Sequence, residues 1–240
     1  MRTKSASDFI REWCADAQED SHGYVVADFM GVAQVVLYPS KDEWRRGRQQ
    51  TLGASDVPTI MGLTDAWRTP KQLYLEKVGE VVGEVQENED MRIGTESETQ
   101  IKELYAIEHS ELTVYDGSNM IFISREYPFA SCSLDAIVHH GDRLCDLEIK
   151  CGRFGEKWKG NYLPDNYFVQ LLWQSFVTGI TDLHLIARLR FMDGGATEKH
   201  YRFDATDEDV ATQREALLPH CEDFWRMVCD KQYFPKFIRI

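Results

Sequence analysis

The chain has 240 residues, and its 27 Lys and Arg against 40 Asp and Glu give a formal net charge of −13. This length suits one domain, 1–240. A composition of 43% hydrophobic and 12% aromatic residues can bury a core, which excludes a disordered chain. No run of 18 apolar residues occurs, and the first 20 residues lack a signal-peptide stretch. We therefore expect no membrane association and a cytoplasmic location.

Cysteine usage and net charge bound the chemistry further. The six cysteines include no Cys-x-x-Cys pair, so we expect free thiols and neither a structural zinc nor an iron–sulfur cluster. Phosphates are bound by Lys and Arg, so the overall negative charge argues at first against a nucleic-acid partner.

In the N-terminal half, the predicted elements follow from capping residues, glycines and apolar spacing. They are, in chain order, a short amphipathic helix over 7–19, an extended or irregular stretch over 24–38, a basic cluster at 44–48, a helix N-cap at Gly53-Ala54-Ser55-Asp56, a helix from Thr69-Pro70 to Lys77, and an acidic stretch over 84–111 that becomes helical in its later part.

The C-terminal half contains closely spaced strands and two strong helices. The strands are predicted at 112–115, 120–124, 131–139, 143–150, 183–191 and 198–203; the helices are predicted at 164–178, ending at Gly179, and at 206–230. This order predicts an α/β or α+β domain built around one mixed sheet that is flanked by helices.

A hairpin within this region brings charged side chains together. Gly-Asp at 141–142 lies between two strand-like runs and is a signal for a two-residue turn. Counting outward from that turn places Asp135 opposite Glu148 and Ser133 opposite Lys150. Opposed residues project from the same face, with Cβ atoms roughly 5 Å apart, and residues two apart along a strand share a face. We therefore expect Asp135, Glu148 and Lys150 to converge.

Two neighbouring carboxylates repel each other unless a cation neutralises them. Together with a backbone carbonyl they form a site suited to Mg²⁺ or Mn²⁺, and a lysine beside such a metal can orient a water. Phosphodiester hydrolysis requires this set of groups. The alternative interpretation is a surface hairpin with solvated acids and one salt bridge, which the hairpin alone would favour.

The spacing of Asp135, twelve residues, then Glu148-Ile149-Lys150 resembles the PD-(D/E)xK nuclease core. The surrounding sequence is similar to the YqaJ-type viral recombinase (lambda exonuclease) family from about Asp42 to Gly179. The motifs that carry this resemblance are Trp44-Arg45-Arg46-Gly47-Arg48, Leu52-Gly53-Ala54-Ser55-Asp56, Gly94-Thr95-Glu96-Ser97-Glu98, Cys132-Ser133-Leu134-Asp135, Leu147-Glu148-Ile149-Lys150-Cys151 and Tyr167-Phe168-Val169-Gln170.

The resemblance implies a restriction-endonuclease-like fold over a motif-bearing core at 42–180. An N-terminal extension over 1–40 would precede that core, and C-terminal strands and a helix over 181–240 would follow it. The resemblance also implies that Arg48 and Ser55 hold the 5′-phosphate of DNA, with Ser133 as a further phosphate contact.

The resemblance further implies a metal centre and the residues that act beside it. Asp135, Glu148 and the carbonyl of Ile149 would bind Mg²⁺, with Glu98 in support. Lys150 would be the catalytic lysine, and Gln170 would help it to position the attacking water.

Three departures from the family pattern bear on these assignments. Asp56 stands at a position where Glu is also seen. Leu134 replaces the usual Pro and leaves the spacing of Asp135 unchanged. The family often has Gln-x-Gln in the late helix, whereas Leu172 stands at the second position here. The local sequence over 170–173 instead resembles the Gln-Leu-x-x-Tyr motif of RecB-type nucleases.

Basic residues concentrate around the motifs despite the global charge. Residues 41–50 carry a net charge of +2 and residues 150–159 a net charge of +3, whereas residues 84–111 carry −7. An inner groove can therefore attract DNA while the outer surface repels it.

The site residues and the family resemblance together imply a Mg²⁺-dependent 5′→3′ exonuclease on double-stranded DNA ends. By resemblance it would be encoded by a phage, prophage or bacterium, work with a single-strand annealing protein and form a ring-shaped homo-oligomer, a trimer. The alternatives are a RecB-like or structure-specific nuclease of different polarity, and a non-catalytic DNA-end-binding protein.

Overall fold

The computed structural model describes residues 3–63, 68–80 and 89–233. The described helices are α1 (Ala6–Trp13), α2 (Lys41–Gln49), η1 (Ala54–Asp56), α3 (Val57–Ile60), α4 (Pro70–Lys77), α5 (Glu89–Glu108), η2 (Glu156–Trp158), α6 (Asp165–Thr178) and α7 (Glu208–Cys229). The strands are β1 (Cys14–Glu19), β2 (Val25–Phe29), β3 (Ala33–Leu37), β4 (Thr113–Asp116), β5 (Met120–Ser124), β6 (Ser131–Cys132), β7 (Ala136–His140), β8 (Arg143–Arg153), β9 (Asp182–Arg190) and β10 (Ala196–Asp204). None of the described helices has the length and apolar content needed to cross a membrane.

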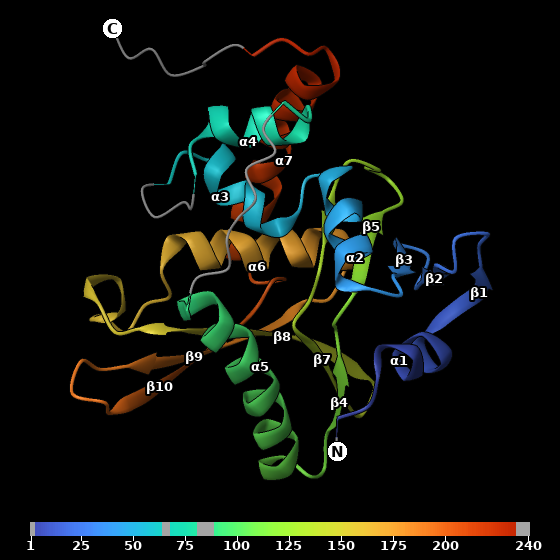
Figure 1. Ribbon diagram of the computed structural model, residues 1–240. Helices are drawn as coiled ribbons and strands as arrows, with labels where there is room; N and C mark the ends of the chain where they lie inside the picture. The colour runs from blue at the N-terminus through green and yellow to red at the C-terminus, as the bar shows by residue number, and fades with distance from the viewer. Residues whose placement is uncertain (1–2, 64–67, 81–88, 234–240) are drawn as a thin grey trace, which may run out of the picture.

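A mixed sheet with the strand order β10-β9-β8-β7-β4 forms the centre of the fold and confirms the predicted mixed sheet. Strands β8 and β9 pair in parallel, and the other neighbours pair antiparallel. Helix α5 covers one face, where Ile101 and Tyr105 pack against Leu147 and Ile149. Helix α6 crosses the opposite face, and α3, α4 and α7 lie beyond it (Figure 1).

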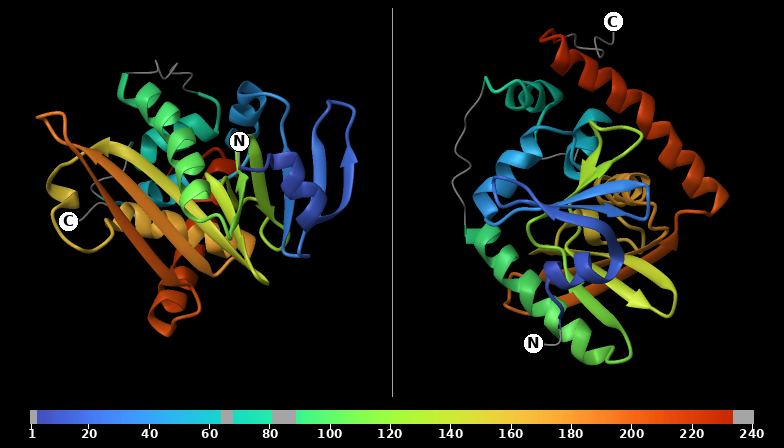
Figure 2. Two further views of the ribbon diagram at one scale, coloured as in Figure 1. Left: turned by 90° about the horizontal axis from the view of Figure 1, so that it is seen from below. Right: turned by 90° about the vertical axis from the view of Figure 1, so that its right-hand side faces the viewer.

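A second sheet, with the order β1-β2-β3-β5-β6, is antiparallel throughout; the sequence analysis did not separate it from the mixed sheet. Figure 2 shows this sheet beside the mixed one, with β1 at its outer edge. The N-terminal segment is built into the core through it, because Phe9 and Phe29 contact Phe122 of β5, with ring centroids 6.1 and 5.3 Å apart.

Two predicted elements differ from the structure. The helix predicted over 7–19 ends at Trp13, and residues 14–19 form the exposed edge strand β1. Backbone pairing with β2 outweighs the weak helical preference of this segment, which lacks apolar residues at helical spacing. The strand predicted over 131–139 is divided, because the chain passes from the antiparallel sheet to the mixed sheet between β6 and β7.

Helix α6 joins the two sheets to the segment that precedes η1. It ends as predicted at Gly179, which adopts a left-handed conformation (φ 73°) that glycine accommodates without steric cost. Its fully buried Trp173 donates its indole N–H to the carbonyls of Ser131 (3.2 Å) and Leu52 (3.4 Å). Helix α6 is therefore tied to β6 of the antiparallel sheet and to Leu52, two residues before η1.

Candidate active site

The predicted hairpin register is confirmed and places the first carboxylate. Residues 136–140 pair with 143–147 around the 141–142 turn, where Gly141 has φ 65°. The ladder stops there, so Asp135 lies one residue beyond it and does not form a cross-strand pair. Instead the carboxylate of Asp135 accepts a hydrogen bond from the backbone N–H of Ile149 at 2.8 Å.

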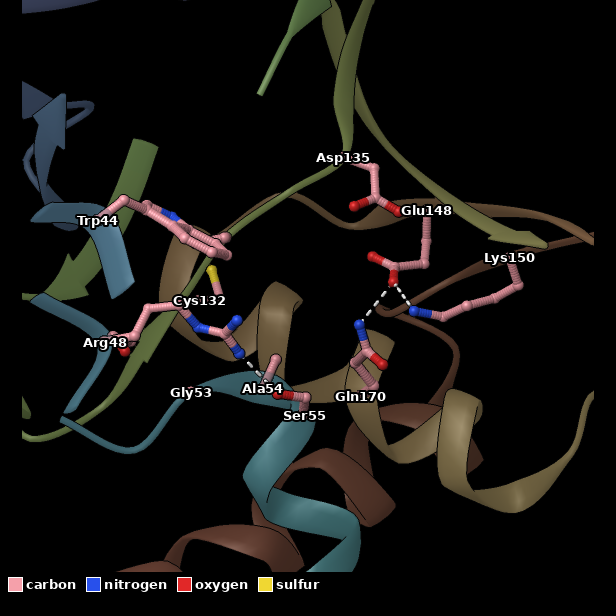
Figure 3. Close-up of a pocket in the computed structure, with 12 residues that line it drawn as sticks. Trp44, Arg48, Gly53, Ala54, Ser55, Cys132, Asp135, Glu148, Lys150 and Gln170 are labelled. Atoms are coloured by element: carbon pink, nitrogen blue, oxygen red, sulfur yellow. Dashed lines mark hydrogen bonds and ion pairs between the residues drawn. The ribbon is translucent and has the colours of Figure 1, made fainter. Parts of the chain in front are cut away.

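Glu148 is the buried centre of the site, with 2% of its surface exposed. One carboxylate oxygen accepts from Lys150 Nζ and from Gln170 Nε2 (2.6 Å), and the other accepts from Gln174 Nε2 (2.7 Å). Figure 3 shows Lys150 and Gln170 converging on Glu148 from β8 and α6, with Asp135 beside them. The three sequence-predicted residues Glu148, Lys150 and Gln170 therefore meet in one network.

Sequence reasoning missed Gln174, which is fully buried. The family pattern has its second glutamine at the position of Leu172, but Leu172 packs in the hydrophobic core. On a helix, residues four apart share a face, so Gln174 follows Gln170 onto the side that contacts Glu148. That i, i+4 spacing was the available signal. The amide of Gln174, donating from α6, helps to fix the orientation of the Glu148 carboxylate.

Electrostatic coupling in this network follows from burial. Burial and the negative charges of Glu148 and Glu98 raise the pKa of Asp135 well above its usual value, against the opposing effects of Lys150 and the N–H of Ile149. Burial alone would lower the pKa of Lys150, but the charges of Glu148 and Asp135 outweigh that effect and raise it. Lys150 is therefore an ammonium ion and a hydrogen-bond donor at neutral pH.

Arg48 and Ser55 form a second polar pair, and both line the same pocket as Glu148 and Lys150. The guanidinium Nη2 of Arg48 donates to Ser55 Oγ at 2.8 Å, and the guanidinium lies 4.7 Å from the ring centroid of Trp44. The helix predicted after Gly53 is short, consisting of the 3-10 turn η1 and the single turn α3. Positive charge at this end of the pocket is therefore supplied by the arginine side chain.

One pocket of about 200 Å³ contains both groups. The liquid volume of one water is about 30 Å³, so the pocket has room for roughly six waters or for a group of the size of a phosphate. Seven predicted residues are among those that line it: Arg48, Ser55, Ser133, Asp135, Glu148, Lys150 and Gln170. Figure 3 shows the guanidinium and the two carboxylates facing the same space.

Ser133 reaches the pocket in a different way from the prediction. It does not pair with Lys150, because the chain leaves the hairpin ladder at Asp135. Its hydroxyl donates to the carbonyl of Met120 at 2.8 Å and accepts from the indole N–H of Trp44 at 3.1 Å. The single hydroxyl hydrogen is thus already used, and Ser133 would have to rotate to donate to a phosphate.

Glu98 lies next to the pocket and is not among its lining residues. Its carboxylate contacts the ammonium of Lys102 at 3.0 Å, one helical turn further along α5. The same ammonium reaches Asp116 at 2.6 Å and the backbone carbonyl of Asp135 at 3.0 Å. Glu98 therefore acts on Asp135 through its charge, and its support of a metal stays a prediction.

The oxygen atoms around Asp135 fit the ligands of a hard divalent cation. Over residues 3–63, 68–80 and 89–233, no three His, Cys, Asp or Glu side chains are arranged to hold a metal. Mg²⁺, however, is commonly bound by one or two carboxylates, with water and substrate phosphate as its other ligands. In antiparallel geometry the N–H and C=O of one residue point to the same side, so the carbonyl of Ile149 faces Asp135 as its N–H does. Asp135, Glu148 and this carbonyl form a suitable oxygen set.

Comparison with known proteins gives sequence relatives and structural neighbours. The sequence model of the YqaJ-like viral recombinase domain matches residues 43–181. An uncharacterized YqaJ protein of Bacillus subtilis (strain 168) is 25% identical over 132 residues, which are 55% of this chain and 40% of that protein. The chain thus spans less than half the length of this relative.

The fold resembles that of solved exonuclease structures. The structure of LHK-Exo in complex with dAMP superposes with a TM-score of 0.59 at 19% identity, over 78% of this chain and 94% of that one. The alkaline exonuclease LHK-Exo from Laribacter hongkongensis superposes with a TM-score of 0.52 at 21% identity, over 80% and 97% of the two chains. At these identities the likeness establishes the fold.

Proposed function

The chain belongs to the YqaJ-like viral recombinase family, and from that premise we propose that it is a Mg²⁺-dependent nuclease that degrades one strand of duplex DNA from its 5′ end. The observation that carries this proposal is the shared pocket. The Asp135–Glu148–Lys150 cluster and the Arg48–Ser55 pair line the same cavity. A terminal phosphate bound by Arg48 and Ser55 would therefore place the adjacent phosphodiester near the Asp135–Glu148–Lys150 cluster.

Each residue of the site has a chemical role in this proposal. Asp135, Glu148 and the carbonyl of Ile149 would hold the cation, which supplies positive charge beside the scissile phosphate. Lys150 is an ammonium ion, so it donates a hydrogen bond that orients the attacking water or stabilises charge on the phosphate. Gln170 uses its N–H on Glu148, and its carbonyl oxygen can accept from the same water.

The polarity of the enzyme would follow from the Arg48–Ser55 pair. A guanidinium forms strong, charge-assisted hydrogen bonds with phosphate oxygens, and a terminal phosphate offers more charge than an internal one. Recognition of a 5′-phosphate would start digestion at that end, release mononucleotides and leave a 3′ overhang. We propose that a single-strand annealing protein takes up this overhang and that a ring of identical chains, a trimer, surrounds the DNA.

The test uses linear duplex DNA labelled at one end and carrying either a 5′-phosphate or a 5′-hydroxyl. With Mg²⁺, wild-type protein should digest the phosphorylated substrate faster and should be inactive in EDTA. Lys150→Ala should retain binding to DNA ends and lose hydrolysis by more than a hundredfold, within the range for loss of a catalytic group. Hydrolysis by Lys150→Ala at the wild-type rate would refute the mechanism.

The same assay separates the alternatives. Digestion from the 3′ end, or cleavage within the duplex, would identify a RecB-like or structure-specific nuclease, the interpretation suggested by the sequence over 170–173. Binding to DNA ends without Mg²⁺-dependent hydrolysis would identify a non-catalytic DNA-end-binding protein.

A further inference from the structure

We propose that Lys77 is a positioning residue that holds the backbone behind Arg48 and Ser55, and thereby sets the preference for 5′-phosphorylated DNA ends. The segment that it holds, residues 48–56, is called the phosphate cradle below. This inference rests on the proposed function, because it assigns a residue to the recognition of the 5′-phosphate. Lys77 itself is not among the residues that line the pocket, so it would act through the cradle.

The ammonium of Lys77 ties two parts of the cradle to α4. Its side chain is 4% exposed, and Nζ lies 2.9 Å from the carbonyl oxygen of Arg48 and 2.6 Å from that of Thr51. A third contact, at 2.8 Å, reaches a carboxylate oxygen of Asp56. An ammonium has three N–H donors, so all three are matched by acceptors at both ends of the cradle.

Asp56 closes the cradle from its far end. It is 2% exposed, and the carboxylate oxygen that contacts Lys77 also accepts from the backbone N–H of Gly53 at 2.9 Å. Burial would raise the pKa of Asp56, but the charges of Lys77, Arg68 and Arg48 lower it below its usual value. The carboxylate therefore stays ionised, and the Lys77–Asp56 pair is a fixed element beneath the loop.

The position of the Arg48 guanidinium depends on this backbone. Arg48 and Ser55 are seven residues apart, and their 2.8 Å hydrogen bond requires the loop between them to keep its curvature. Without the ammonium, the carbonyls of Arg48 and Thr51 and the carboxylate of Asp56 would lose a buried partner, which is costly enough to make the loop relax. The residues proposed to bind the metal lie elsewhere: Asp135 directly precedes β7, and Glu148 and Ile149 lie on β8. The described contacts of Lys77 are with the cradle, so this relaxation should affect phosphate recognition first.

The test compares Lys77→Met with a matched variant on the same helix. Lys71 is exposed on α4, so Lys71→Met makes the same substitution on the same helix and leaves the cradle contacts of Lys77 in place. For each protein, kcat/KM is measured on 5′-phosphate and 5′-hydroxyl duplexes with Mg²⁺, and the dissociation constants for both duplexes are measured in EDTA. Arg48→Ala provides the reference for complete loss of phosphate recognition.

We expect Lys77→Met to reduce the ratio of the two kcat/KM values by about tenfold, the equivalent of one charge-assisted hydrogen bond. The binding ratio in EDTA should fall in parallel, and Lys71→Met should keep both wild-type ratios. A folded Lys77→Met protein with wild-type ratios would overturn the inference while leaving the proposed function intact. A wild-type protein that hydrolyses DNA without preferring a 5′-phosphate would overturn the proposed polarity and the inference with it.

Lys77→Arg is the second variant, because it keeps the charge beside Asp56 and alters the fit to the two carbonyls. Its ratio should fall less than that of Lys77→Met. Should neither variant fold, as judged by circular dichroism and thermal unfolding, Lys77 would be assigned to global stability and the positioning role would be rejected.

Discussion

Replacement of Gln174 by leucine should uncouple Glu148 from α6 without opening a cavity. The substitution removes two hydrogen bonds that Nε2 donates, one to the Glu148 carboxylate at 2.7 Å and a longer one to the carbonyl of Ser133 at 3.3 Å. The bond to the charged carboxylate contributes about 1.5–3 kcal/mol. Part of this loss is offset, because the amide oxygen of Gln174 has no hydrogen-bond partner among the described residues and leucine buries more apolar surface. We expect a net destabilisation of about 1–2 kcal/mol, or roughly 2–8 °C in Tm for a chain of this size.

The effect on hydrolysis should exceed the effect on stability. Groups that orient a metal ligand typically change activity by about 10–100-fold when they are replaced. The expected loss of kcat is therefore about 10–100-fold at saturating Mg²⁺, which corresponds to about 1.4–2.7 kcal/mol in the activation free energy. Hydrolysis of linear duplex is measured over a Mg²⁺ series, with thermal unfolding on the same samples.

Gln213→Leu is the control, because Gln213 is exposed on α7 and its side-chain amide donates to the carbonyl of Asp209 on the same helix. It should behave as the wild type in both measurements. If Gln174→Leu hydrolysed DNA at the wild-type rate and with the wild-type Mg²⁺ requirement, Gln174 would not orient Glu148 and the reasoning from this contact would be refuted.

Three further predictions concern the residues around the site. Asp135→Asn should abolish hydrolysis and should raise Tm at pH 7 in EDTA. The pKa of Asp135 is raised on folding, so the wild type loses stability relative to the variant as the pH rises above about 4. A variant that is less stable than the wild type at pH 7 would contradict this. Gly117→Ala should lower both Tm and activity, because its methyl group would overlap the carbonyl oxygen of Leu134, next to Asp135; wild-type values for both would be inconsistent with this packing. Burial and neighbouring His200 lower the pKa of His184 to about 4, so wild type should lose stability as pH falls from 6.5 towards 4, and His184→Gln should lose less in urea unfolding over that range.

Local sequence signals predicted the parts of the fold that depend on neighbouring residues. The Gly-Asp turn at 141–142 set the register of β7 and β8, because the side-chain period of a strand leaves one register for a given turn. Gly179 likewise ends α6 as predicted, because a residue in the left-handed conformation stops a helix and glycine adopts that conformation readily. Both features follow from backbone geometry over a few residues.

Long-range contacts explain the errors in the sequence analysis. Residues 14–19 form a strand because β2 offers a pairing edge, and the local sequence carries no sign of that partner. Ser133 turns towards Met120 and Trp44, because the chain changes sheets at this point. A sequence pattern shows which side chains share a face of one helix or strand. It does not show where the chain passes from one sheet to another, as it does between β6 and β7.

The sequence by itself determined the chemical groups of this protein and their local spacing: two carboxylates and a lysine across one hairpin, and an arginine seven residues before a serine. The tertiary structure decided that these two groups share one pocket, that Gln174 supports Glu148, and that Lys77 ties α4 to the phosphate cradle. The reason is physical. Turn and strand geometry act over a few bonds, whereas the pairing of a buried ammonium or amide depends on which segments the folded core brings together.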